Sequence, residues 1–307
     1  MSFHAERSLR GALAVEVDAQ AKLNLRLQIL ARETTGFHQL ETLFLRVELA
    51  DTLRLRCTTG AFTVDVTGDV DLALVGPPEQ NLALRAARAY AVASGMRGGV
   101  AIEIEKRIPI GGGMGGGSAD AGAVLRALDA MADAPIGPAA LHDVAAALGS
   151  DVPFLASEMT YALAWGRGER MLSLTPPPVR NVALLVPSIS VNTAEAYSWL
   201  AASRASASPR PTAVALEVDH LSDWEHIARI GVNEFEDVVS ARYPTIGALI
   251  DSLHGAGFAI AMMSGSGSTV FGISADDLGH LSHVGETTRV IRTRTATNVA
   301  PVRMIAS

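Results

Sequence analysis

The sequence predicts an α+β fold, in which helices and strands do not alternate regularly along the chain. Several segments with the period-two pattern of strands follow one another directly in the first 70 residues, and the first helical pattern comes only after them. At 307 residues the chain is long enough for two modest domains or one large one, each with its own core. The sequence shows no internal repeat.

Composition excludes several classes of protein. Hydrophobic residues make up 49% and charged residues 19%, which is typical of a globular chain. The net charge of -7, with scattered Lys and Arg, does not predict a nucleic-acid surface. The first ten residues lack the apolar core of a signal peptide, and no apolar run reaches the roughly 20 residues that span a bilayer. We therefore expect a cytoplasmic protein without nucleic-acid or membrane partners. The single cysteine, Cys57, permits neither an internal disulfide nor a cysteine metal cluster.

The first half of the chain contains most of the strand patterns. Residues 13–30 alternate, with Leu23 and Leu25 on one side and Lys22 and Asn24 on the other, which predicts a strand with one buried face. Further strands are expected at 40–49, 52–57, 62–67 and 100–108.

Helices are predicted on both sides of a glycine-rich stretch. Residues 81–93 have helical spacing, and apolar residues from Ala121 to Met131 recur at intervals of three and four. Another helix at 138–148 is expected to end at Gly149, as a left-handed C-terminal cap.

The second half of the chain begins near Ala156. The expected elements are a hairpin at 161–174, a strand at 181–186, a helix at 193–202, a surface loop at 203–213, and helices to 254. A strand–loop–strand (AIAMMSGSGSTVFGI), a helix and a last strand at 289–295 follow.

The glycine-rich stretch indicates a phosphate-binding loop. Six of the seven residues from Gly111 to Gly117 are glycine, although glycine costs up to about 1 kcal/mol relative to alanine in regular structure. Glycine lets backbone N–H groups approach a ligand, and the following helix adds the positive end of its dipole. Ser118 and Asp120 fall in its first turn. The alternative is a tight turn in which Ser118 is an ordinary helix N-cap.

Three known phosphate motifs can be compared with this loop. A Walker loop requires Gly-Lys-Ser/Thr, whereas here Ser118 directly follows Gly117. Gly111, Gly113 and Gly116 fit the dinucleotide pattern G-x-G-x-x-G, but the preceding strand alternates, and no acidic residue follows a second parallel strand at the expected offset. Protein-kinase signatures are absent.

The segment PIGGGMGGGSAD at 109–120 resembles the second motif of the GHMP small-molecule kinases. Its triple-glycine form is typical of those members that act on a cytidyl diphosphate sugar alcohol. Other segments resemble this family in the same order, over about residues 15 to 275. They are AKLNLRL (21–27), GFHQLETLF (36–44), NLALRAA (81–87), LGSDVPF (148–154), GRGE (166–169), VNTAEAY (191–197), VNEFEDVV (232–239) and MSGSGSTVF (263–271).

The resemblance implies a two-domain α+β fold with the active site in the cleft between the domains, which we expect at 1–158 and 159–307. It also implies transfer of the γ-phosphate of ATP to the 2-hydroxyl of 4-diphosphocytidyl-2-C-methyl-D-erythritol, in the non-mevalonate route to isoprenoid precursors. Mg²⁺ is expected to be held mainly through the nucleotide phosphates, without a metal site of protein ligands. A homodimer is one possible assembly.

Lys22 and Asp151 match the catalytic pair of this family. A hydroxyl that attacks phosphorus needs a carboxylate to orient it and accept its proton, and a neighbouring lysine keeps such a carboxylate ionised. Outside this context, Lys22 would more often be solvated on a strand, and Asp151 would more often be a turn or cap residue. Whether Asp151 removes the proton or positions the hydroxyl is left open.

The resemblance assigns four residues to the substrate. Asn24 lies two residues from Lys22 on the same strand face and reaches the same ligand. His38 matches a position that hydrogen-bonds cytosine, and Phe37 and Tyr197 match positions that stack on it. Without the family context, core packing would be the better explanation for both rings.

The nucleotide is assigned to the glycine loop and two neighbouring positions. Asn81 and Lys106 match positions near the adenine of ATP. Ser118 is expected to contact a phosphate or the magnesium ion, and the loop 265–268 to close on the phosphates from the second domain. The loop residues are Pro109, Ile110, Gly111, Gly112, Gly113, Met114, Gly115, Gly116, Gly117, Ser118 and Ala119.

Three departures from the family pattern concern the substrate more than the phosphoryl transfer. Thr35 and Phe37 stand where the family usually has aspartate and tyrosine, Ala119 replaces a serine, and Leu45 replaces a glutamine. Two alternatives therefore stay open. One is another GHMP kinase that acts on a sugar, an amino acid or an isoprenoid alcohol, and the other is a non-catalytic nucleotide-binding sensor.

Overall fold

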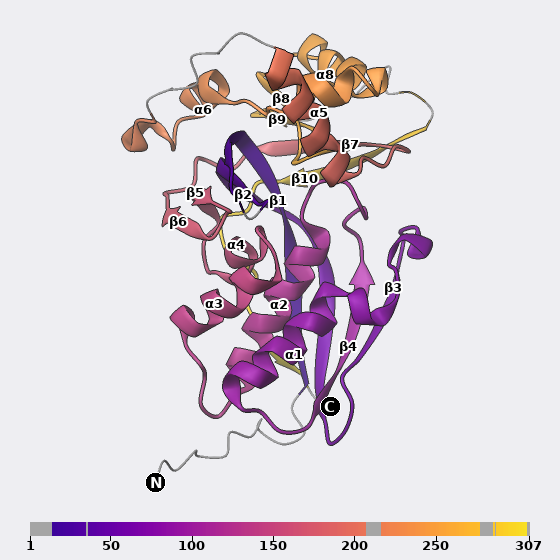
Figure 1. Ribbon diagram of the computed structural model, residues 1–307, viewed down its shortest axis with the longest axis vertical. Helices are drawn as coiled ribbons and strands as arrows, with labels where there is room; N and C mark the ends of the chain where they lie inside the picture. Colours follow the sequence, from indigo (N-terminus) through magenta and orange to yellow (C-terminus); the bar gives the residue numbers. More distant parts are fainter. Residues whose placement is uncertain (1–13, 35, 207–215, 277–284, 286, 306–307) are drawn as a thin grey trace.

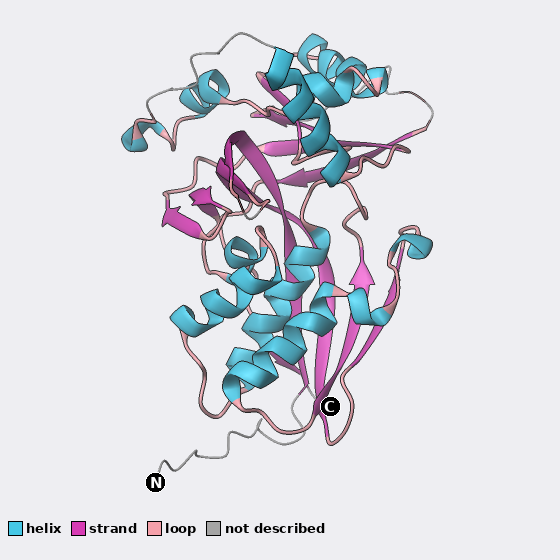
Figure 2. Cartoon of the chain, viewed as in Figure 1, coloured by secondary structure: helices cyan, strands magenta, loops and turns pink. Residues whose placement is uncertain are grey.

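Two antiparallel-rich sheets, each accompanied by helices, make up the protein. The computed structural model describes residues 14–34, 36–206, 216–276, 285 and 287–305. Figure 1 shows a larger part with long strands behind helices α1 to α4, and a smaller part with β7 to β10 beneath α5 and α8. Figure 2 shows that helices and strands are segregated rather than alternating, which confirms the predicted α+β class. No helix among the described residues is long and apolar enough to cross a membrane.

The larger sheet has the strand order β11-β1-β2-β4-β3, and β5 and β6 extend it from β2. Every pair is antiparallel except β3 and β4, which are parallel because α1 connects them. The strands are β1 (Ala14–Arg32), β2 (His38–Thr58), β3 (Thr63–Gly68), β4 (Gly99–Lys106), β5 (Tyr161–Gly166), β6 (Arg170–Ser173) and β11 (Arg303–Ile305). The sequence did not predict β11, which is only three residues long.

Two strand predictions need correction. The segments 40–49 and 52–57 form the single strand β2, because Ala50 and Asp51 also pair with β1, although the register shifts between Ala50 and Arg46. The polar side of β1 is not exposed as predicted: Lys22 and Asn24 are 3% and 2% exposed. The glycine loop covers this side, and Met114 accepts a hydrogen bond from the backbone N–H of Lys22.

The helices of the larger part pack on one another and on the sheet. They are α1 (Leu82–Ser94), α2 (Gly116–Met131), α3 (Pro138–Leu148) and α4 (Val152–Ala156). Asn81 caps α1, since its side chain accepts hydrogen bonds from the N–H groups of Ala83 and Leu84. The prediction of a left-handed cap at Gly149 is wrong, because its φ of 167° is extended. The chain turns there directly into α4, and Val152 donates to the Gly149 carbonyl.

The smaller sheet has the order β10-β7-β9-β8, with every pair antiparallel. Its elements are β7 (Asn181–Pro187), β8 (Ile260–Met263), β9 (Val270–Ser274), β10 (Thr288–Arg294), α5 (Thr193–Ser206), α6 (Trp224–Ile230), α7 (Glu236–Ser240) and α8 (Pro244–Gly255). Short 3₁₀ helices lie at Leu72–Leu74, Pro78–Gln80 and Val218–His220.

Helix α5 is longer than predicted and takes the first residues of the expected 203–213 loop. Arg204 in its last turn donates to the Ile29 carbonyl and to the Glu234 carboxylate, which anchors the helix end to β1. The rest of that loop, and the helix expected after β9, lie outside the described residues.

The larger sheet takes strands from both sides of the boundary predicted between residues 158 and 159, and that boundary stays a prediction. One edge of β2 pairs with β4 along 52–58 and with β5 along 40–45, so the first part of the expected second domain belongs to the first sheet. The chain also returns to this sheet at its end, where β11 pairs with β1. Strand β2 has 21 residues, so one of its edges can pair with both β4 and β5. The sequence pattern does not reveal this double pairing.

The contact between α2 and α4 depends on Gly122, and alanine there should destabilise the fold. A Cβ at this position would lie 2.5 Å from the backbone carbonyl carbon of Leu155. Overpacking costs about 1–3 kcal/mol, more than the roughly 1 kcal/mol that alanine gains over glycine in a helix. We expect Gly122→Ala to lower the free energy of unfolding in urea. Gly247→Ala in α8 is the control and should raise it, because its Cβ would lie an ordinary 3.5 Å from Ser240.

Candidate active site

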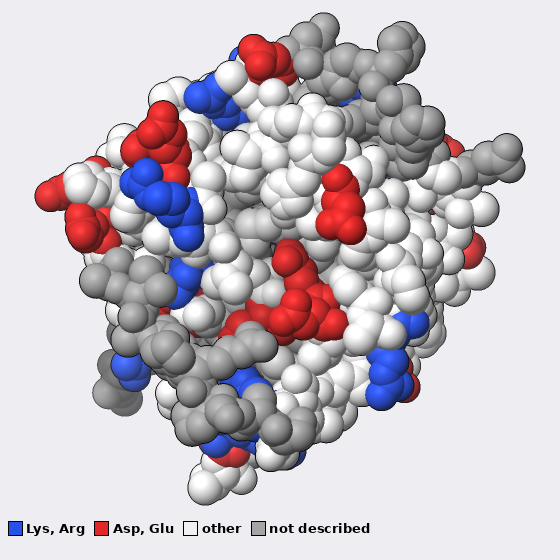
Figure 3. All heavy atoms as spheres, turned by 90° about the horizontal axis from the view of Figure 1, so that it is seen from above, with Lys and Arg blue, Asp and Glu red and all other residues white. Residues whose placement is uncertain are grey.

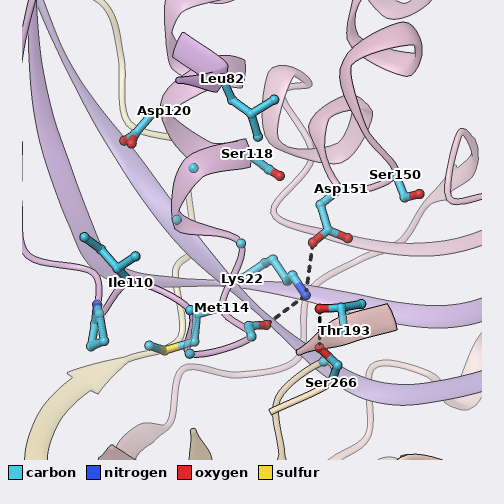
Figure 4. A pocket seen from close by; sticks show the side chains of 18 of the residues that line it. Lys22, Leu82, Ile110, Met114, Ser118, Asp120, Ser150, Asp151, Thr193 and Ser266 are labelled. Atoms are coloured by element: carbon cyan, nitrogen blue, oxygen red, sulfur yellow. Dashed lines mark hydrogen bonds and ion pairs between the residues drawn. The ribbon is translucent and has the colours of Figure 1, made fainter. Parts of the chain in front are cut away.

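A cavity of about 680 Å³ lies between the two parts of the molecule, and Figure 4 shows the side chains around it. Most of the predicted site residues line it: Lys22, Asn24, Asn81, Lys106, Pro109, Ile110, Gly111, Gly112, Gly113, Met114, Gly115, Gly116, Gly117, Ser118, Asp151 and Tyr197. Ala119, Phe37 and His38 do not line it. The N–H of Ala119 is used inside α2, where it donates to the Gly115 carbonyl at 2.7 Å.

The glycine loop has a shape that side chains would prevent. Gly111, Gly113 and Gly115 have φ of 74°, 77° and 71°, in the left-handed region that favours glycine. A Cβ at Gly113 would lie 2.0 Å from the carbonyl oxygen of Ser264, so two backbones approach each other here. Gly115 is the N-cap of α2, and Ser118 lies inside the first turn. The alternative in which Ser118 is the N-cap is therefore excluded.

Lys22 and Asp151 meet at the end of the glycine loop. Their Nζ and Oδ2 atoms are 3.3 Å apart, and Nζ also donates to Asn24 Oδ1 at 2.7 Å and to the Gly113 carbonyl at 3.1 Å (Figure 4). The Lys22 side chain is 4% exposed, whereas that of Asp151 is 30% exposed. The ammonium is thus fixed by three oxygens, while the carboxylate stays open to the cavity.

Sequence reasoning missed several hydroxyl groups of the cavity wall. Thr42 accepts from Asn24 Nδ2 at 2.8 Å and donates to the Arg26 carbonyl, so it fixes the Asn24 amide. Thr193, at the start of α5, and Ser266, between β8 and β9, are joined through their hydroxyls, which are 2.9 Å apart (Figure 4). Both lie in segments with family resemblance, at 191–197 and 263–271, so the only available signal was their motif.

Lys106 belongs to a buried cluster beneath the loop. Its Nζ lies 2.5 Å from Asp51 Oδ2 and 2.7 Å from Asp120 Oδ2. Asp51 also accepts the N–H groups of Arg107 and Ile108, at 2.6 and 2.8 Å, where β4 leads into the loop. The other oxygen of Asp120 is buried without a partner. Burial, together with the charge of Asp51, raises the pKa of Asp120 to about 7, although Lys106 acts in the opposite direction.

The rings predicted to hold cytosine are arranged differently from expectation. Tyr197 stacks on His38, with ring centres 4.1 Å apart, and contacts Phe235 edge-on. Phe37 is 55% exposed and packs against the Arg167 guanidinium, 4.0 Å from its ring centre. Burial and the charges of nearby arginines lower the pKa of His38, which favours the neutral imidazole with one donor and one acceptor nitrogen. The structure therefore brings His38 and Tyr197 together and places Phe37 outside their stack.

The oxygen atoms beside the glycine loop are suitable ligands for a metal ion that is bound mainly by the phosphates of a nucleotide. Among the described residues, no group of three or more His, Cys, Asp or Glu side chains could hold a metal ion. The cavity offers the Ser118 hydroxyl and the Asp151 carboxylate instead. Mg²⁺ usually keeps several waters and takes one or two protein oxygens besides substrate phosphates. Figure 3 shows acidic side chains gathered near the middle of the face seen from above, with basic side chains mostly towards its edges.

Comparisons with known proteins agree with this geometry. The chain matches the family models of the GHMP kinases N terminal domain over residues 81–158 and of the GHMP kinases C terminal over 213–282. It is 39% identical over 261 residues to the 4-diphosphocytidyl-2-C-methyl-D-erythritol kinase of Pelotomaculum thermopropionicum, covering 84% of this chain and 88% of that protein. The kinase of the same name from Desulfotalea psychrophila is 39% identical over 273 residues, covering 87% of this chain and 88% of that protein. The crystal structure of a 4-(cytidine 5'-diphospho)-2C-methyl-D-erythritol kinase has a TM-score of 0.71 and 32% identity, covering 91% of this chain and 98% of that one.

The raised pKa of Asp120 predicts a pH dependence of stability. The folded chain keeps a proton on Asp120 up to about pH 7, whereas the unfolded chain releases it near the ordinary value of 3.8. This contribution to stability is therefore complete below the ordinary value and is lost as the pH rises towards 7. We expect Asp120→Asn to reduce the fall in unfolding free energy between about pH 5 and about pH 8, measured in urea. An equal fall in wild type and variant would contradict this, and Asp143→Asn, at an exposed position of α3, is the control.

Proposed function

The chain belongs to the GHMP kinase family, and on this basis we propose that it transfers the γ-phosphate of ATP to the 2-hydroxyl of 4-diphosphocytidyl-2-C-methyl-D-erythritol. The observation that carries the phosphoryl transfer is the Lys22–Asp151 pair at the end of the glycine loop. The relatives at 39% identity, which cover most of this chain, support the identity of the acceptor.

Asp151 is proposed to orient the acceptor hydroxyl and to accept its proton. Its carboxylate is the partly exposed member of the pair and faces the cavity, so a hydroxyl can come within hydrogen-bond distance. Lys22 is held by Asn24 and by the Gly113 carbonyl, so its positive charge stays beside the reacting oxygens. A fixed charge of this kind stabilises the negative charge of the transition state without reorganisation.

The glycine loop and the start of α2 are proposed to bind the phosphates of ATP. Gly115 and the following glycines leave backbone N–H groups accessible at the positive end of the helix dipole. Ser118 would contribute a hydroxyl to a phosphate or to Mg²⁺. When bound, Mg²⁺ neutralises charge on the β- and γ-phosphates. Asn81 and Lys106 also line the cavity, and we propose that they contact the adenine.

His38 and Tyr197 are proposed to recognise the cytosine. A neutral imidazole can pair one donor and one acceptor with the edge of a base, while an aromatic ring covers its face. Asn24, fixed by Thr42, would contact the substrate beside Lys22. Phe37 would reach the base only if it left its contact with Arg167.

An ADP-release assay with purified protein and several acceptors tests the proposed reaction. We expect turnover with 4-diphosphocytidyl-2-C-methyl-D-erythritol and little with homoserine or mevalonate. Turnover of homoserine or mevalonate without turnover of the cytidyl compound would refute the proposed acceptor but not the kinase chemistry. Absence of ADP release with every acceptor, from protein that still binds ATP, would favour a nucleotide-binding sensor.

Asp151→Asn should lower kcat by about 10²- to 10⁴-fold, which is the usual contribution of general acid–base catalysis. The amide keeps the shape of the side chain but cannot accept the proton, so the KM for ATP should change little. Rates of ADP release measure both constants. Asp251→Asn replaces an exposed carboxylate of α8 and should leave them unchanged. Undiminished turnover of Asp151→Asn would disprove the assigned role.

Tyr197→Leu should raise the KM for the cytidyl substrate without a comparable change in the KM for ATP. Stacking of a base on an aromatic ring contributes about 1–3 kcal/mol, which corresponds to about 5- to 150-fold in binding. Initial rates at varied concentrations of each substrate separate the two constants. Trp165→Leu, on β5 and outside the cavity lining, is the matched control. An equal rise in both KM values would indicate a general loss of structure instead.

A further inference from the structure

The glycine loop is held from the other part of the molecule by the segment between β8 and β9. Ser264 Oγ donates to the Gly113 carbonyl at 3.0 Å, and the N–H of Thr269 donates to the Gly112 carbonyl at 3.3 Å. Gly265 and Ser266, between these contacts, line the cavity. The shape of this second loop therefore determines how the glycine loop lies over the Lys22–Asp151 pair.

The side chain of Asn233 fixes the second loop at its base. Its Nδ2 donates to the carbonyls of Met263 and Gly265, at 2.7 and 2.8 Å, and its Oδ1 accepts from the N–H of Phe235 at 3.0 Å. Asn233 is 3% exposed, so these bonds do not compete with water. Both N–H groups of the amide are used, and a buried carbonyl that loses its donor costs about 1–3 kcal/mol.

The backbone around Asn233 is tied to the strand that carries Lys22. The N–H of Leu27 donates to the Val232 carbonyl at 2.7 Å, and the N–H of Glu234 donates to the Leu27 carbonyl at 3.1 Å. Leu27 and Asn233 form an isolated parallel bridge. Asn233 thus stands between β1, which presents the catalytic lysine, and the loop that holds the glycine loop in place.

We propose that Asn233 is a positioning residue for phosphoryl transfer, which acts by holding the 264–267 loop against the glycine loop. It does not line the cavity, so its effect passes through the carbonyls of Met263 and Gly265. This assignment rests on the proposed kinase function, and it gives a role to the segment 232–239, which had a family resemblance but no assigned task. In-line transfer is sensitive to such a displacement, since a 1 Å misplacement can cost about 100-fold in rate.

Asn233→Asp is the decisive variant. A carboxylate still accepts from Phe235 but faces two carbonyl oxygens without a proton to donate, whereas a protonated carboxyl group can donate to one of them. We expect kcat to fall by about 10- to 100-fold near pH 8. Glu236 accepts from the N–H of Met263 at 2.8 Å, and burial raises its pKa to about 7, so it titrates in this pH range in wild type and variant alike. The comparison is therefore the ratio of variant to wild-type kcat, which should recover as the pH is lowered to about 6. A merely structural loss would not recover in this way.

Asn181→Asp is the matched control, because the half-buried Asn181 also donates to a backbone carbonyl, that of Asp276, but through a solvent-exposed hydrogen bond outside the cavity lining. It should keep wild-type kcat at both pH values. Ser264→Ala, which removes the hydroxyl that holds Gly113, completes a double-mutant cycle with Asn233→Asp. The fold-decrease of kcat in the double variant should be smaller than the product of the fold-decreases in the two single variants, because both substitutions act through one loop. Multiplicative effects, or a kcat ratio independent of pH, would overturn the proposal.

Amide hydrogen exchange of the full chain without ligands tests the same assignment independently of activity. Near pH 8, residues 264–267 should exchange faster in Asn233→Asp than in wild type or Asn181→Asp. Unchanged exchange would overturn the positioning role even if the variant were less active. Faster exchange in a chain that phosphorylates none of the acceptors would support this role for Asn233 and refute only the proposed reaction.

Discussion

The buried ammonium of Lys22 is the constraint on which the rest of the site depends. A lysine on a central strand can be buried only if oxygens surround its charge, and here Asn24, the Gly113 carbonyl and Asp151 do so. The loop must come close enough to supply that carbonyl. A Cβ at Gly115 would make a tight contact of 3.1 Å with Cε of Lys22, and the φ of 71° also favours glycine there. Burial of the Lys22 ammonium therefore depends on the close approach of the glycine loop, which leads directly into α2.

The same loop joins the two parts of the molecule. On one side it bonds to β1 through Lys22 and Met114, and on the other it bonds to the 264–269 segment. Apart from the Ser264 hydroxyl, these contacts use backbone groups, which hold a fixed geometry better than long side chains do. If this loop binds phosphates as proposed, contacts on both sides fix its shape in the absence of ATP. Less binding energy is then needed to order it, and more remains for the transition state.

Much of the fold could be predicted from periodicity, because β1, α1, α2 and α3 each place apolar residues at strand or helix spacing. In three places where the prediction failed, a segment distant in the sequence decided the outcome. The polar side of β1 is buried because a loop about 90 residues away covers it, and β5 joins the first sheet because the long edge of β2 has room for it. Phe37 packs on Arg167 through a contact across 130 residues. The family resemblance identified the Lys22–Asp151 pair, but Asn233 could be recognised only from its hydrogen bonds.

Exposure of the carboxylate, rather than a raised pKa, is the reason to assign the proposed proton transfer to Asp151 and not to Asp120. A carboxyl with a pKa near 7 is often a sign of catalysis, and on that criterion Asp120 would be the candidate base. Yet one oxygen of Asp120 is bonded to Lys106, and the other is completely buried, so neither can reach a substrate hydroxyl. Asp151 has a single lysine partner and 30% of its side chain open. The Lys106 cluster therefore shapes the corner from which the glycine loop departs, and Asp151 is the carboxylate that stays accessible for the proton transfer proposed for it.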